Sequence, residues 1–120
     1  MKLLKTVASV FYENLDQGKE FFINILGFHI VHEDEGLCVV TKDDVTFHIS
    51  IDEEYSKILP PLYRVETDNI QELWKQIKLK DPKGKYLHDR FPNGPELRPW
   101  GAYEFAYLDS QVCLVFQQWK

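Results

Sequence analysis

The segment at residues 45–51 reads VTFHISI, in which apolar and polar side chains alternate at every position. Successive side chains of a β-strand point to opposite faces of its sheet. The apolar set is therefore expected to pack under a helix, and the polar set, with His48 at its centre, faces the other way. This strand predicts a sheet with a helix on one side and polar groups on the other.

The residues before this segment predict a strand, a helix and two more strands. Residues 6–11 are rich in β-formers. Asp16 is a plausible N-cap for a helix at residues 19–26, whose apolar side chains recur at helical spacing. Gly27 then ends the helix. Two short strands are expected at residues 28–32 and 37–41.

The second half of the chain repeats this order of elements. A linker at residues 53–61 ends in Pro60 and Pro61, which continue neither a helix nor a central strand. The expected elements are a strand at 62–66, a helix at 69–79 capped by Asp68, a long loop at 81–98, and strands at 100–108 and 112–119. We interpret the chain as one domain, residues 1–120, with modules at about 1–52 and 62–120.

Alternation also assigns faces in the second module. Arg64, Glu104 and Gln117 fall opposite the apolar side chains of their strands. A polar sheet face is either exposed to water or, where curved half-sheets face each other, the wall of a ligand cleft. The sequence leaves both interpretations open.

Composition limits the classes of function. The chain has 14 basic and 19 acidic residues, a net charge of −5, and its one basic cluster, at residues 75–85, is interrupted by Asp81. Solvated helix surface explains that cluster better than nucleic acid, which requires clustered positive charge. No apolar run is long enough for a membrane span or a signal peptide, so a cytoplasmic location without membrane partners is expected. Cys38 and Cys113 lie in apolar runs and are expected to be reduced.

Several segments resemble the vicinal oxygen chelate superfamily, in its glyoxalase and bleomycin-resistance-like branch. Residues 20–28 (EFFINILGF) are similar to that group's opening helix, and residues 98–109 (RPWGAYEFAYLD) to a characteristic segment near its end. The closing strand at residues 114–117 and the corner at 65–69 also match. The resemblance implies an α+β fold of two βαβββ modules that form a curved mixed sheet with helices on one face, in a homodimer.

Enzymes of this superfamily hold a divalent metal with one residue from each of four strands. Carried over by position, the four sites fall on Lys5 or Val7, on His48, on Leu62 or Arg64, and on Val115 or Phe116. A first-row metal needs three or more N, O or S donors. Only His48 is a competent ligand, so we expect no metal site and no other cofactor.

Candidate ligand-binding residues follow from the polar face and the resemblance. His48 is one candidate, because an imidazole can donate, accept or transfer a proton near neutral pH. A histidine can also make a hydrogen bond that is only structural. Glu104 and Arg64 can contact a ligand or pair with each other. Trp100 and Tyr103 can stack on a flat ligand, and Trp100 can instead pack against a partner subunit. The set is His48, Arg64, Trp100, Tyr103, Glu104 and Gln117.

The sequence favours a metal-independent protein that binds a small organic molecule, such as an antibiotic or a metabolite, in the manner of bleomycin-resistance proteins. The alternative is a glyoxalase-like lyase, isomerase or dioxygenase that uses His48 and Glu104 as acid and base, or an unrecognised divalent metal. A dimeric interaction module without a ligand is a third interpretation. One scaffold hosts many chemistries, so the fold does not choose among them.

Overall fold

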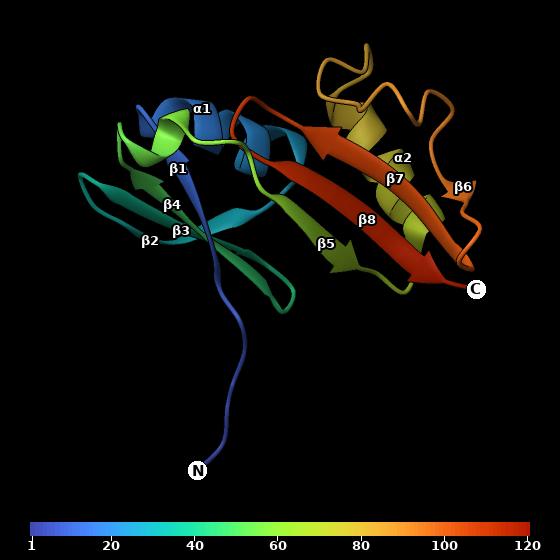
Figure 1. Ribbon diagram of the computed structural model, residues 1–120, viewed down its shortest axis with the longest axis horizontal. Helices are drawn as coiled ribbons and strands as arrows, with labels where there is room; N and C mark the ends of the chain where they lie inside the picture. Colours follow the sequence, from blue (N-terminus) through green and yellow to red (C-terminus); the bar gives the residue numbers. More distant parts are fainter. The chain divides into compact units, whose positions relative to one another are not determined.

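The computed structural model describes residues 1–120 and divides into two compact units, Met1–Ile58 and Leu59–Lys120. The boundary between them falls inside residues 53–61. Each unit contains a four-stranded mixed sheet with its helix on one face (Figure 1). None of the helices has the length and apolar composition that crossing a membrane requires.

The first unit follows the order strand, helix, three strands. Its strands pair in the order β1-β4-β3-β2, with β1 parallel to β4 and the other neighbours antiparallel. The elements are β1 (Ala8–Tyr12), α1 (Leu15–Lys19), the π-helix η1 (Glu20–Ile25), β2 (His29–Glu33), β3 (Leu37–Lys42), β4 (Val45–Ile51) and the 3-10 helix η2 (Tyr55–Lys57).

The second unit repeats this topology. Its strands pair in the order β5-β8-β7-β6, and β5 runs parallel to β8 as β1 does to β4. The elements are β5 (Leu62–Glu66), α2 (Ile70–Lys80), β6 (Glu96–Leu97), β7 (Ala102–Leu108) and β8 (Cys113–Trp119). The predicted α+β fold of two βαβββ modules is confirmed, with each module forming a sheet of its own.

The core of each unit lies between the sheet and its helix, as strand alternation predicts. In the first unit Phe22 of η1 meets Phe47 of β4, with ring centroids 4.8 Å apart. In the second, Trp74 of α2 meets Phe105 of β7 at 5.3 Å. His48 therefore does not lie under a helix, because it neighbours Phe47 in the strand and projects to the opposite face.

Several predicted details of the elements are wrong. The N-caps are Asn14 and Asn69 rather than Asp16 and Asp68, because the asparagine side-chain oxygens accept backbone N–H groups of the first turns. The segment at residues 81–98 is not all loop, since its Glu96 pairs with Glu104 in a two-residue strand. The predicted linker contains the short helix η2.

Candidate ligand-binding site

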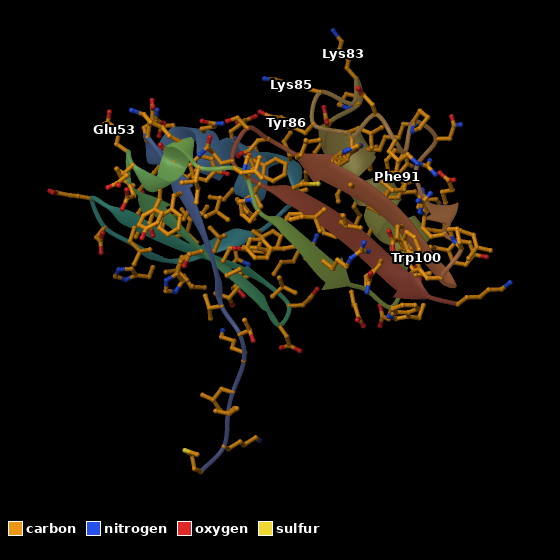
Figure 2. All side chains as sticks on the ribbon, viewed as in Figure 1. Glu53, Lys83, Lys85, Tyr86, Phe91 and Trp100 are labelled. Carbon is orange, nitrogen blue, oxygen red and sulfur yellow. The ribbon has the colours of Figure 1, made fainter.

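Four of the six predicted site residues meet in the second unit. Arg64 on β5, Glu104 on β7 and Gln117 on β8 project from the face of the sheet opposite α2, which we call the helix-free face. Trp100 reaches the same cluster from the turn before β7 (Figure 2). We call these four residues the Arg64 cluster.

Glu104 is the anchor of the Arg64 cluster. Its side chain is 3% exposed, and its Oε2 atom accepts hydrogen bonds from Nη1 of Arg64 at 2.8 Å and from Nε1 of Trp100 at 2.7 Å. Both bonds are charge-assisted and therefore stronger than bonds between neutral groups. They satisfy a buried carboxylate, which would be costly to leave unpaired. The arrangement holds an arginine and an indole in fixed places.

The Arg64 guanidinium is held through one of its terminal nitrogens. Its Nη1 atom also donates to Oε1 of Gln117 at 3.1 Å, so both Nη1 hydrogens have protein acceptors. The side chain as a whole is still 44% exposed. The protein hydrogen bonds of Arg64 involve Nη1, so its Nε and Nη2 atoms have no protein acceptor. A guanidinium edge of this kind suits a carboxylate, phosphate or carbonyl group.

A tight turn delivers Trp100 to the cluster. The backbone N–H of Gly101 donates to the carbonyl of Arg98 at 2.9 Å, and that of Arg98 donates to the carbonyl of Ala102 at 2.8 Å. Gly101 has φ of 93°, a conformation that other residues rarely adopt. The turn places Trp100 four residues before Glu104, within reach of its carboxylate.

The Trp100 ring is half exposed and lies near two arginines. Its relative exposure is 49%, and the guanidinium carbons of Arg98 and Arg64 lie 4.9 Å and 5.9 Å from its centroid. A cation near the face of an aromatic ring is stabilised, because that face carries partial negative charge. Arg98 also lies 6.0 Å from the Phe91 ring. Sequence reasoning missed Arg98, although its place two residues before Trp100 was a usable signal.

The two remaining predicted residues are Tyr103, on the other face of the second sheet, and His48, in the first unit. Tyr103 neighbours Glu104 in β7 and pairs with Gln118, so its side chain is on the face that carries Phe105 and α2. His48 belongs to the first unit, where it is partly buried on the helix-free face of β4 and pairs with Ser9 of β1 and Val39 of β3. The structure therefore does not bring Tyr103 into the Arg64 cluster.

The strand positions that the resemblance equates with metal ligands do not fit a metal. Arg64 pairs with Val115, which offers a cation and a hydrocarbon. Lys5 donates its ammonium to Oγ1 of Thr46 at 3.0 Å. No group of three or more His, Cys, Asp or Glu side chains in the structure is arranged to hold an ion.

The comparisons with known proteins rest on structure. No family model and no curated sequence matches the chain. A bleomycin-binding protein from Streptomyces verticillus, solved with copper(II)-bleomycin, is similar with a TM-score of 0.76 and 20% identity over 100% of this chain and 99% of that one. A transposon-encoded bleomycin resistance determinant has a TM-score of 0.74 and 20% identity, covering 97% and 98%.

Proteins related to glyoxalase share the same architecture. A glyoxalase-related enzyme from Clostridium phytofermentans has a TM-score of 0.72 and 18% identity over 100% of this chain and 98% of that one. At these identities the likeness establishes the fold and leaves function to the site. The chain therefore has the vicinal oxygen chelate fold that these bleomycin-binding and glyoxalase-related proteins have in common.

Proposed function

We propose that the protein binds a small organic molecule at the Arg64 cluster, without a metal. The observation that carries this proposal is a partly exposed arginine held by a buried carboxylate beside a half-exposed indole. Binding sites need a few polar groups in fixed positions next to apolar surface. Solved proteins of the same fold bind bleomycin, which supports a binding role of the bleomycin-resistance type.

The ligand this arrangement suits has a flat ring and a hydrogen-bond acceptor. The ring would lie on Trp100, where stacking adds to the burial of apolar area. The acceptor would take the N–H groups on Nε and Nη2 of Arg64. Because Glu104 and Gln117 already hold Nη1, the arginine loses little side-chain freedom on binding, and that lowers the entropic cost.

Catalysis by Glu104 is less well supported than binding. A general base needs a lone pair directed at the substrate, but the Glu104 side chain is 3% exposed and its Oε2 atom already accepts two hydrogen bonds inside the protein. We propose that Glu104 positions Arg64 and Trp100.

A thermal-shift screen of aromatic acids, aromatic amines, neutral aromatics and glycopeptide antibiotics tests the proposal. A ligand at one hundred times its Kd should stabilise the protein by about 2.7 kcal/mol. For a hit, Arg64→Gln should raise the Kd about tenfold or more, the cost of one charged hydrogen bond. Arg90→Gln removes the same charge from an arginine outside the cluster and should leave the Kd unchanged.

Two results would contradict the proposal. One is a panel in which no compound stabilises the protein. The other is stoichiometric zinc, nickel, manganese or iron that survives dialysis of the purified protein, because retained metal would favour the glyoxalase-like alternative. Arg64→Gln is expected to fold, since the arginine side chain is 44% exposed.

A further inference from the structure

The helix side of the second unit carries an open groove away from the Arg64 cluster. Trp74, Lys75, Lys78, Leu79 and Pro82 line it, from α2 and the residues just after it, and its volume is about 520 Å³. That volume lies within the range of small-molecule pockets, roughly 300 to 1,000 Å³. Leu79 is 82% exposed, although α2 turns its other apolar residues inward.

The floor of this groove is held rigidly. The Trp74 ring packs edge-on against Phe105 at 5.3 Å and also lies near Tyr107, at 6.4 Å. A Cβ atom at Gly94 would come within 2.5 Å of the indole, so only glycine lets that loop close against the ring. Because the ring is fixed on these sides, a ligand on its open face would not have to order it.

The rim of the groove is cationic. The Lys78 ammonium lies 5.4 Å from the Trp74 ring centroid, and the lysines at 75, 78, 80, 83 and 85 are all exposed. Asp81, the acidic residue among them, is buried, and its two oxygens accept the backbone N–H groups of Lys85 and Tyr86 at 2.9 Å. Its charge is therefore engaged by the backbone of the loop, while the lysine charges face water.

We propose that this groove binds a small amphipathic anion, with its apolar part on Trp74 and Leu79 and its acidic group on Lys75 and Lys78. An apolar floor stabilises a hydrocarbon or aromatic body, and two ammonium groups at the rim select a carboxylate or sulfonate over a neutral or cationic head. The chain as a whole has a net charge of −5, which repels anions, so the binding of an anion would depend on the lysines of the groove.

Decanoate, kept below its micellar concentration, is a suitable probe. NMR titration of the full chain should give saturable shifts of the Trp74 indole and of the amides of α2, with decanol and decylamine binding at least about fivefold more weakly. Higher salt should weaken the binding of decanoate and leave the binding of decanol unchanged, because salt screens only the charged head group.

Exposed residues allow well-matched variants. Lys78→Gln should raise the Kd for decanoate about threefold, and Leu79→Ser by a similar factor through lost apolar contact. Lys83→Gln is the control, because it removes the same charge from a lysine that extends away from the loop after α2 and does not line the groove (Figure 2). Lys83→Gln should leave the Kd unchanged.

Three outcomes would overturn the proposal. They are equal binding of decanoate and decylamine, equal effects of Lys78→Gln and Lys83→Gln, and binding to phosphatidylglycerol vesicles without binding to free decanoate. The last would assign the face to a membrane surface. The signals used belong to α2, so the result does not depend on whether the Arg64 cluster binds a ligand.

Discussion

The two units share a topology but differ in the chemistry of their helix-free faces. On the first sheet that face has hydroxyls and an imidazole beside apolar side chains such as Val39 and Leu37, and Lys5 donates to Thr46, two residues before His48 in β4. On the second it has a buried carboxylate that holds an arginine and an indole. The apolar side toward the helix sets the topology in both, so the helix-free face is free to take on different roles.

The largest effect should come from the side that the two units share. Phe47→Ala in the first and Phe105→Ala in the second each remove a buried ring from between sheet and helix. Each should lower the free energy of unfolding by roughly 3 to 5 kcal/mol, because a cavity adds to the lost transfer energy. Urea unfolding measures both. A much smaller loss in either variant would show that packing between sheet and helix stabilises that unit less than it stabilises the other unit.

The next prediction compares the stability that polar groups on the two helix-free faces contribute. Glu104→Ala should cost roughly 2 to 3 kcal/mol, because it leaves the donors of Arg64 and Trp100 without their acceptor; the exposure of Arg64 limits the loss. Thr46→Val, at a buried polar position on the first sheet, should cost less than about 1 kcal/mol. Chemical denaturation compares the two. Equal losses would contradict the view that only the second face is built around a buried charge.

A third prediction concerns Tyr107, on the face of the second sheet that packs against α2. The Tyr107 hydroxyl is buried without a hydrogen-bond partner, and burial, aided by Asp81, raises the pKa of Tyr107 to about 12. The folded state therefore holds the proton more tightly than the unfolded state. Stability from this residue is full below pH about 10 and is lost as the pH rises through 12, by at most about 2.7 kcal/mol.

Tyr107→Phe isolates this contribution. The variant should be as stable as the parent or more stable at pH 7, because it removes an unsatisfied buried hydroxyl. Between pH 10 and 12 it should lose less stability than the parent in thermal unfolding. If the two proteins lost stability in parallel over that range, the tyrosine would not be the group that titrates.

The last prediction concerns Arg64, the residue that Glu104 holds. Arg64→Ala should lower the free energy of unfolding by about 1 to 2 kcal/mol, less than Glu104→Ala, because water can solvate the carboxylate through the space that the arginine leaves. Guanidinium chloride titrations can resolve the difference. A larger loss for Arg64→Ala than for Glu104→Ala would reverse the roles of anchor and anchored group.

Strand alternation predicted the faces well because the period of two is local. The segment at residues 45–51 is a strand with the predicted bounds, and Arg64, Glu104 and Gln117 share the predicted face. Alternation also places Tyr103 opposite Glu104, which is why the structure separates it from the cluster. The metal-free site, the homodimer and the cytoplasmic location stay predictions.

Other features were beyond the reach of sequence reasoning. The Arg64–Glu104 pair joins residues 40 positions apart, so a face assignment permits it without requiring it. Asn14 and Asn69 cap the helices although an aspartate stands near each, since caps depend on where the chain turns. The π-helix of residues 20–25 has the same apolar spacing as an α-helix would over so few residues.

The Trp100 indole provides the most direct test of the proposed binding surface. Its N–H group donates to Glu104, so its NMR signal reports on the cluster itself. Titration with the tightest compound from the screen should shift this signal and the amides of residues 64, 104 and 117, and Arg64→Gln should weaken the response about tenfold. Saturable binding that leaves the indole signal unmoved and shifts another region would contradict the account.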